Sequence, residues 1–255
     1  MARSMNGSRW VCVLVLLFPS VSVAGDFERG VEAFDKKDYD LAVTSFTKAI
    51  EANPKAPAAY FYRGLAYREK KEYNKALGDF TDAIRLEPHP APCYYNRAIV
   101  HAEKKDFEKA LKDLDEAVRL EPKNASPYAG RGSVHYDNKE YGKAEADCLT
   151  AIRLDPKLSV GFNNLAWLRA TCPNAKFRDG KKAVELATKA CELSEWKVWF
   201  ELNTLAAAHA ENGDFKEAMK WQKKAIELGT GDKAALDKAN QRLKVYEKGE
   251  PYRQE

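Results

Sequence analysis

Four arginines recur at equal intervals in the first half of the sequence, and they are its clearest candidates for chemistry. Arg29, Arg63, Arg97 and Arg131 are 34 residues apart. Each stands in a stretch with the apolar spacing of a helix, at a position where that spacing would place an apolar residue. A row of guanidinium groups could bind an acidic ligand, because arginine donates paired hydrogen bonds to carboxylates and phosphates. The same groups could instead form ion pairs that fasten the fold.

Residues at a fixed distance from these arginines favour internal ion pairs. Sixteen residues later stands an aspartate in three cases, which gives the pairs Arg63 with Asp79, Arg97 with Asp113, and Arg131 with Asp147. The same offset from Arg29 reaches Ser45, so this arginine has no such partner. Further along, the corresponding positions are Leu165 with Leu186 and Leu205 with Trp221. Because charge occurs with opposite charge and apolar with apolar, we predict contacts between helices.

Other residues with catalytic or metal-binding chemistry do not form a recognisable constellation. His101 and His135 occupy equivalent places one period apart. Equivalent atoms of packed helices are on the order of 10 Å apart, whereas zinc ligands each lie about 2 Å from one metal. The sequence contains no HExxH, CxxC or GxSxG motif and no glycine-rich phosphate loop. We therefore expect no enzymatic activity, no cofactor and no metal, and we interpret the long "TCPNAKFRDG" segment as a structural insertion.

The elements that carry these residues repeat with the same period. Pro54, Pro88, Pro122 and Pro156 are 34 residues apart, and fixed-period similarity is typical of stacked repeats. The second window has aromatic and small residues in two helical stripes, at Tyr60, Gly64, Tyr67, Tyr73, Ala76, Phe80 and Ala83. The polar "KKE" between the stripes predicts a turn, and proline ends the second helix. Each period is therefore expected to be two antiparallel helices, the first from Tyr60 to Lys70 in this window.

This motif of an aromatic, Gly, Tyr, Ala, Phe, Ala and Pro resembles the tetratricopeptide repeat. The resemblance covers residues 24 to about 230 and implies an all-α, right-handed α-solenoid of about six helix pairs. The expected domain spans residues 25–231, with units at 24–56, 57–90, 91–124, 125–158, 159–198 and 199–231. The fifth unit departs from the pattern, because its inter-helix turn is about five residues longer. Residues 232–255 are expected to form a capping helix, from Lys233 to Lys248, and a short tail.

In the resembled family, the first helix of each pair lines a concave groove that binds peptides. Carried over by position, the resemblance implies a partner-binding groove with these residues: Phe27, Val31, Phe61, Leu65, Arg68, Tyr95, Ile99, Tyr136, Asn163, Trp167 and Asn203. Acidic residues are expected at its margin: Asp35, Glu69, Glu103, Asp137 and Glu211. An alternative is that some of the aromatic residues pack between units. The family's carboxylate-binding sub-type is not matched, since Phe61 and Leu65 stand where it has Lys and Asn.

The N-terminal residues predict export. Arg3 and Arg9 precede a short apolar run from Val11 to Phe18, followed by Pro19 and small residues to Ala24. This order is typical of a signal peptide cleaved after Ala24, and the run is too short for a membrane span of roughly 20 residues. We therefore expect a periplasmic or secreted protein; the alternative is an uncleaved N-terminal membrane anchor.

The net charge and the cysteines indicate which partners to expect and in which state the thiols are. The net charge of +4 falls to +2 without residues 1–24, which gives no reason to expect nucleic acid or an anionic membrane as partner. Four cysteines remain outside the signal segment and are expected as buried free thiols: Cys93, Cys148, Cys172 and Cys191. The alternative for an exported protein is a disulfide between Cys172 and Cys191. The sequence therefore favours a non-enzymatic scaffold that binds a protein or peptide partner. A structural or self-assembling component of an envelope complex is the alternative.

Overall fold

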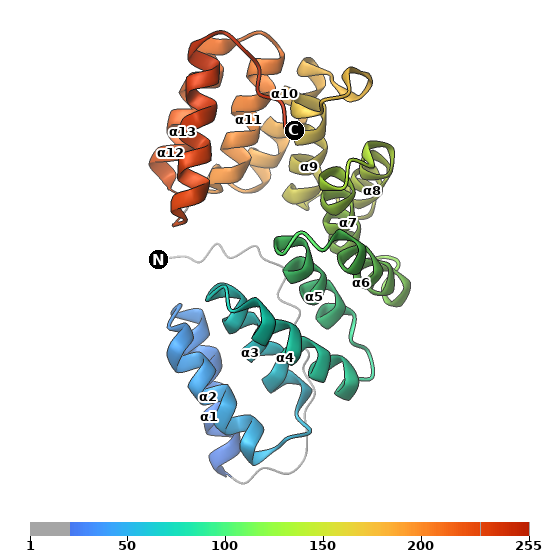
Figure 1. Cartoon of the computed structure of the whole chain (residues 1–255), viewed down its shortest axis with the longest axis vertical. Helices are drawn as coiled ribbons and strands as arrows, with labels where there is room; N and C mark the ends of the chain where they lie inside the picture. The colour runs from blue at the N-terminus through green and yellow to red at the C-terminus, as the bar shows by residue number, and fades with distance from the viewer. Residues whose placement is uncertain (1–20, 230, 255) are drawn as a thin grey trace. The chain divides into compact units, whose positions relative to one another are not determined.

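The computed structural model describes residues 21–229 and 231–254, and over these residues the chain is all-helical. The predicted signal segment, residues 1–24, lies outside the described residues apart from the start of the first helix at Val21. The chain divides into two compact units, residues 1–122 and 123–255. Each unit is built from antiparallel helix pairs laid side by side (Figure 1), which confirms the predicted all-α architecture of stacked helix pairs.

The first unit contains three helix pairs. Their bounds are α1 Val21–Asp35 with α2 Tyr39–Ala52, α3 Pro57–Glu69 with α4 Tyr73–Leu86, and α5 Ala91–Glu103 with α6 Phe107–Leu120. The predicted start of α3 at Tyr60 was three residues late, because Pro57 already occupies the first turn. Proline suits that position, where its missing N–H has no partner to lose.

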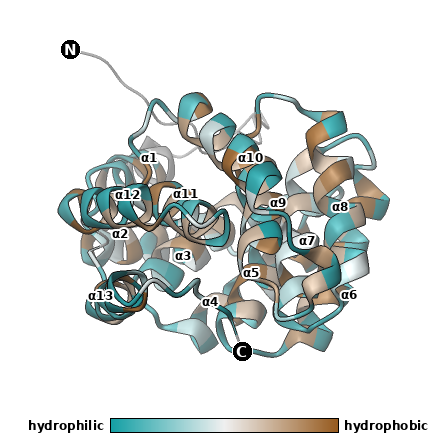
Figure 2. Cartoon of the chain, turned by 90° about the horizontal axis from the view of Figure 1, so that it is seen from above, coloured by the Kyte–Doolittle hydropathy of each residue, from teal (hydrophilic) through white to brown (hydrophobic). Residues whose placement is uncertain are grey.

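The second unit contains three more pairs and a last helix. Their bounds are α7 Ala125–Asp137 with α8 Tyr141–Leu154, α9 Ser159–Thr171 with α10 Gly180–Leu193, α11 Trp199–Glu211 with α12 Phe215–Leu228, and α13 Lys233–Glu247. Between α9 and α10 lies a short 3₁₀ helix, η1 Ala175–Phe177. Helix α13 is mostly hydrophilic, and its buried residues are Ala239 and Tyr246 (Figure 2). It therefore has the character of the predicted capping helix, with one face packed and the other polar.

A left-handed residue ends the first helix in most of the pairs. Lys37, Lys71, Lys105 and Lys139 have φ between 59° and 62°. At Lys71, the N–H donates to the carbonyl of Arg68 (2.8 Å), and the next N–H, of Glu72, donates to the carbonyl of Tyr67 (2.9 Å). These two hydrogen bonds together form the Schellman motif. It turns the chain within three residues, so that the second helix runs back along the first.

Small residues allow the two helices of a pair to approach closely. A Cβ atom on Gly64 would lie 2.9 Å from the ring of Phe80, and one on Gly132 would lie 2.9 Å from the sulfur of Cys148. Both distances are shorter than side chains tolerate. The facing alanines, Ala76 and Ala83, are fully buried. The glycine and alanine positions of the repeat therefore set the spacing within each pair, as the sequence predicted.

Among the described residues, no helix is both long enough and apolar enough to span a bilayer. No group of three or more His, Cys, Asp or Glu side chains in this part of the chain is arranged to hold a metal ion.

Candidate functional site

The periodic arginines form ion pairs inside the helix stack. Arg97 donates from Nε and Nη2 to the two carboxylate oxygens of Asp113, both at 2.7 Å, and Arg63 makes the same paired contact with Asp79 at 2.8 Å. Arg131 binds Asp147 in the same way at 2.8 Å. These contacts confirm the predicted pairs and occupy the guanidinium edge that an anionic ligand would need.

Each of the first two pairs also reaches back to the preceding helix pair. Arg63 Nη1 donates to Thr47 Oγ1 of α2 at 3.0 Å, and Arg97 Nη1 donates to Thr81 Oγ1 of α4 at 3.0 Å. Hydrogen bonding to the aspartate raises the pKa of Arg63 and of Arg97. One arginine thus joins its own helix, its partner helix and the preceding helix.

The remaining positions of this series are explained by exposure and packing. Arg29 is exposed, and Ser45 at the aspartate position is buried. Leu165 and Leu205 are buried, and Leu205 belongs to the same apolar cluster against which Leu186 and Trp221 pack. Apolar packing around Leu205 and Trp221 therefore takes the place of the ion pair in the pair α11–α12.

The predicted groove residues of the first unit are largely involved in packing between helices. Phe27 lies 5.6 Å, ring centre to ring centre, from both Phe46 and Tyr62. Phe61 and Leu65 pack against the cluster that contains Phe80. All the predicted groove residues of this unit are half-buried: Phe27, Val31, Phe61, Leu65, Arg68, Tyr95 and Ile99. Their apolar surface is thus shared between the inter-helix core and solvent.

Arg68 and the acidic margin of the first unit lie together. Arg68 donates to Glu69 Oε1 at 2.7 Å and to Asn96 Oδ1 at 3.2 Å. Asn96 in turn donates to the carbonyl of Pro92 at 2.8 Å. Burial raises the pKa of the nearby Glu103 carboxyl, although Arg68 acts in the opposite direction. The cation predicted for ligand binding is therefore already bound to a carboxylate.

The second unit contains a cleft of about 510 Å³ between α9, α11 and α13. Three of the predicted residues line it, namely Asn163, Trp167 and Asn203. The other lining residues are Asn164, Trp199, Phe200, Thr204, Asp232, Ala234, Ala235, Lys238 and Arg242. Tyr136 lies outside this cleft, in a smaller cavity of about 70 Å³ that shares Asn164 and Trp167 with it.

Polar atoms at the cleft wall lack partners within the described part of the chain. Asn163 is only 7% exposed, and its Oδ1 accepts no hydrogen bond there. Arg242 donates from Nη1 to Asn203 Oδ1 at 2.9 Å, whereas its buried Nε has no acceptor among these residues. Buried polar groups are normally hydrogen-bonded. The cleft wall therefore contains one buried acceptor and one buried donor that no other described group satisfies.

Aromatic surface surrounds these polar atoms. Phe200 is 40% exposed, and the ring of Trp199 lies 6.0 Å from it. The guanidinium of Arg242 lies 5.3 Å from the centre of the Trp167 ring. Sequence reasoning missed Trp199, Phe200 and Arg242, because it took only the family's groove positions from each first helix and treated α13 only as a cap. The adjacent aromatics "WF" at the start of α11 were the available signal.

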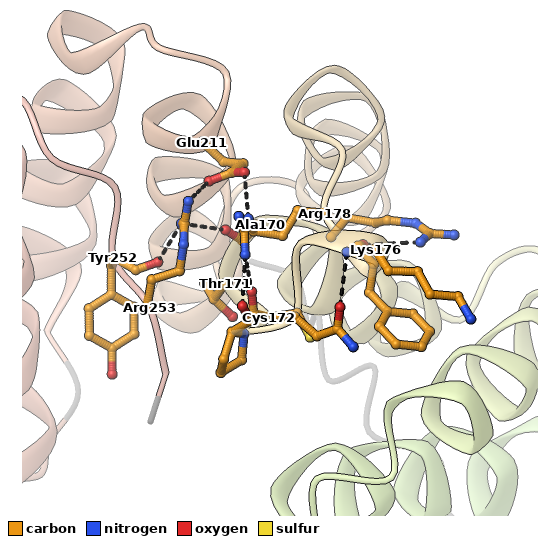
Figure 3. A network of polar contacts seen from close by, with 12 residues as sticks. Ala170, Thr171, Cys172, Lys176, Arg178, Glu211, Tyr252 and Arg253 are labelled. Carbon is orange, nitrogen blue, oxygen red and sulfur yellow. Dashed lines mark hydrogen bonds and ion pairs between the residues drawn. The ribbon is translucent and has the colours of Figure 1, made fainter.

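The C-terminal tail returns to α9 beside this cleft. Trp167 Nε1 donates to Gln254 Oε1 at 2.8 Å, and Gln254 Nε2 donates to Asp137 Oδ1 at 3.1 Å. Arg253 forms an ion pair with Glu211 at 2.5 Å, as Figure 3 shows. Two acidic residues predicted at the groove margin, Asp137 and Glu211, are therefore contacted by the chain's own tail.

The cysteines lie apart from the cleft lining. Cys93, Cys148, Cys172 and Cys191 are all buried and none is in a disulfide, as the sequence predicted. Burial raises the pKa of Cys148 and of Cys191 to about 12. Both are therefore neutral thiols at physiological pH, and unreactive ones, because the thiolate is the nucleophile.

Comparison with known proteins identifies the repeat. Models of the tetratricopeptide repeat match residues 27–91, 91–124, 125–158 and 202–229. Together these matches cover more than half of the chain, which is therefore a tetratricopeptide repeat protein. No curated protein matches the sequence significantly.

Solved structures resemble the fold. A tetratricopeptide repeat protein from Parabacteroides merdae has a TM-score of 0.66 at 20% identity, over 90% of this chain and 88% of that one. PilW, described as a type IV pilus biogenesis factor, has a TM-score of 0.67 at 16% identity, over 87% and 100%. The Cut9–Hcn1 hetero-tetramer of APC/C has a TM-score of 0.74 at 14% identity. That match covers 87% of this chain but only 43% of the other. At these identities the likeness concerns the fold alone.

Proposed function

We propose that this protein is a non-enzymatic scaffold that binds a peptide segment of a partner protein, and that the cleft between α9, α11 and α13 is its principal binding site. The supporting observation is the combination of exposed aromatic surface with an unpartnered acceptor on Asn163 and an unpartnered donor on Arg242. Peptides offer matching groups, since every residue other than proline carries one backbone donor and one acceptor.

The lining residues favour a particular kind of segment. Trp199 and Phe200 suit an apolar or aromatic side chain, and Asn163 suits a backbone N–H. Lys238 and Arg242 outnumber Asp232 among the charged lining residues, so a carbonyl or carboxylate is expected opposite them. An extended ligand loses conformational freedom on binding, and we expect micromolar rather than nanomolar affinity for this reason.

Site-specific crosslinking tests the cleft. A photo-reactive residue in place of Phe200 is expected to capture a partner in extracts of the native host, and Trp199→Ala in the same chain is expected to reduce capture strongly. The matched control places the photo-reactive residue at Leu149, which is 50% exposed on α8. Equal capture from both positions would contradict the proposal.

The half-buried aromatics of the first unit are proposed as an additional contact surface. The variant Phe61→Ala with Tyr95→Ala is expected to lower partner recovery. Both residues also contribute to packing, so recovery is to be compared at a temperature where circular dichroism shows wild type and variant equally folded. Unchanged recovery would restrict binding to the second unit.

We also propose that the protein is exported, with cleavage after Ala24. Such cleavage would remove the first four residues of α1 and leave a helix that begins at Gly25. Mass spectrometry of the protein from the native host is expected to show an N-terminal Gly25. A product that retains residues 1–24 in the membrane fraction would indicate the anchored alternative.

A further inference from the structure

The tail from Tyr252 to Gln254 is held by side chains and backbone groups of three helices. Tyr252 lies with its ring 6.0 Å from Trp167 of α9. Arg253 binds Glu211 at the end of α11 and donates to the carbonyl of Ala170 at 3.4 Å. Gln254 donates its backbone N–H to the carbonyl of Thr171 at 3.2 Å. Its side chain bridges Trp167 and Asp137 of α7.

Glu211, the carboxylate that binds the tail, is also held in position by Arg178, which does not belong to the tail. Glu211 accepts a hydrogen bond from Arg178 Nε at 3.0 Å. Arg178 is itself fixed, because its Nη1 donates to the carbonyls of Cys172 and Pro173 at 2.9 and 3.0 Å. In Figure 3, Arg253 and Arg178 converge on Glu211 from the tail and from the long α9–α10 turn. This acceptor would therefore stay in place if the tail were to leave.

The same residues form part of the cleft wall. Arg242 lies against two neighbouring aromatic rings, with its guanidinium 5.3 Å from the centre of Trp167 and 5.0 Å from that of Tyr252. Trp167 and Arg242 both line the cleft. The tail therefore occupies surface continuous with the cleft, and its contacts are those that an extended peptide ligand makes, with backbone and side-chain hydrogen bonds together.

We infer that the tail is an intramolecular ligand of this surface, which we call the tail site and define as Asp137, Trp167, Thr171, Glu211 and Arg242. A partner segment of the same chemistry, an aromatic residue followed by arginine and then an amide side chain, binds there by displacing it. The inference rests on the proposed function and extends it, since it names a class of partner segment and a means of regulating access to the cleft.

Displacement is feasible because little of the tail is buried. Tyr252, Arg253 and Gln254 are each only half-buried, and a segment with few buried apolar contacts opens at low free-energy cost. Selectivity comes from charge, because Glu211 is 13% exposed at its side chain and would lose its tail cation if a neutral segment took the place of Arg253.

The test uses a labelled peptide of residues 248–255, "KGEPYRQE", and the full chain in two forms. In the released form, Arg253→Glu with Gln254→Ala places a carboxylate beside Glu211 and removes the amide. Fluorescence anisotropy is expected to show at least tenfold tighter peptide binding to the released form than to the native chain, whose site is occupied. Circular dichroism establishes that both forms are folded.

Two matched controls identify the site. Glu211→Gln in the released form is expected to weaken peptide binding at least tenfold, whereas Glu185→Gln on the exposed face of α10 is expected to leave it unchanged. A peptide with Arg253→Glu is expected not to bind. Equal, or equally absent, binding to native and released chains would overturn the inference.

The outcome is separable from that of the proposed function. Partner crosslinking from Phe200 that persists without any peptide binding would contradict the tail inference alone. Peptide binding to the released form without partner crosslinking from Phe200 would instead contradict the cleft as partner site.

Discussion

Three of the four periodic arginines, Arg63, Arg97 and Arg131, have a structural role that explains their recurrence. The side chain of Arg97 is 20% exposed and that of Asp113 is 6% exposed, so both charges are largely removed from water. Such a pair is tolerated because the paired hydrogen bonds satisfy the carboxylate, and the threonine of the preceding helix satisfies a further N–H. The paired hydrogen bonds require both the arginine and the aspartate, and this explains why the charge disappears as a pair in the fifth and sixth repeats.

Removing one member of an arginine–aspartate pair is expected to lower the stability of the fold more than removing both members. Asp113→Ala leaves the charge of Arg97 without its carboxylate partner. We expect this variant to lower the free energy of unfolding by about 3 to 5 kcal/mol. Arg97→Leu with Asp113→Leu is expected to lose less, because no charge is left unpaired. Urea unfolding followed by circular dichroism measures both.

The exposed pair of Arg119 with Glu116 provides the control for this comparison. Its side chains are 66% and 37% exposed, so Glu116→Ala is expected to cost at most about 1 kcal/mol. Equal losses for Asp113→Ala and the double leucine variant would refute the structural role of the pair.

Glu201 gives a pH-dependent prediction. It is 1% exposed at the start of α11, and its Oε2 accepts no hydrogen bond from the described residues. Burial raises the pKa of its carboxyl, while hydrogen bonds with Ser194 and Ser159 oppose the change. The folded chain therefore binds this proton more tightly than the unfolded chain does, so its contribution to stability is complete below the unfolded pKa and is lost as pH rises through the folded pKa.

Glu201→Gln, which resembles the protonated acid, is expected to stabilise the protein at pH 7, where burial of the charged wild-type carboxyl is unfavourable. The advantage over wild type should shrink towards pH 4. Thermal unfolding at a series of pH values measures it, with the exposed Glu185→Gln as control. A pH-independent difference would show that ionisation of Glu201 is not its cause.

At the scale of the helices, four of the turns within helix pairs have lysine at a left-handed position that suits glycine better. Lysine at φ near 60° pays a steric cost that glycine avoids. The corresponding turn between α11 and α12 has Gly213 at φ 84°. The backbone bonds of the turn, and not the identity of the lysine, therefore determine where each first helix ends.

Lys105→Gly is consequently expected to raise the stability of the chain by up to about 1 kcal/mol. Its neighbour Lys104 has φ −83°, and glycine there is expected to lower stability by a similar amount, because it adds freedom to the unfolded chain and removes the hydrogen bond from Lys104 Nζ to Asn74 Oδ1. Urea midpoints of the two variants should move in opposite directions. A shift of the same sign in both would contradict this account.

The helices and their pairs could be predicted from the sequence because the signals are local and repeated. Proline, glycine and alanine at fixed places predicted the pairs, and the offset of 16 residues predicted the contact of Arg97 with Asp113. The greater length of the turn within the fifth repeat was also predicted correctly. This turn has eight residues between α9 and α10, whereas the turn between α1 and α2 has three.

The cleft could be predicted only in part. Asn163, Trp167 and Asn203 were found by position, whereas Arg242 and Gln254 lie far away in the sequence. Their contacts arise from the return of α13 and the tail to α9, which depends on three-dimensional packing without a periodic signal. The burial of Glu201 was missed for the same reason, because its position in the repeat does not by itself predict a buried carboxyl.

At the scale of the molecule, the second unit has a hydrophobic core of its own. Its largest cluster includes Cys191, Leu202 and Leu205, and a second cluster joins α11 and α12 to Tyr246 of α13. Stacked repeats are stabilised by each pair and its nearest neighbours. The unit should therefore hold its structure without contributions from distant repeats.

Residues 123–255 expressed alone are thus expected to be helical and to unfold cooperatively on heating. A shorter fragment, residues 123–228, lacks α13 and is expected to melt at a lower temperature, because the cluster around Ala206 and Ala210 then loses Tyr246. Circular dichroism of both fragments measures the difference. Identical melting would show that α13 does not cap the unit.

The distribution of the arginine–aspartate pairs also affects how the protein responds to heat. The pairs lie in α3–α8, whereas Leu165 and Leu205 take the place of the arginine in α9 and α11. The cost of taking charges out of water falls as temperature rises, while hydrophobic stabilisation per unit area levels off. Warming therefore shifts the balance of stability along the chain towards the repeats that contain these pairs.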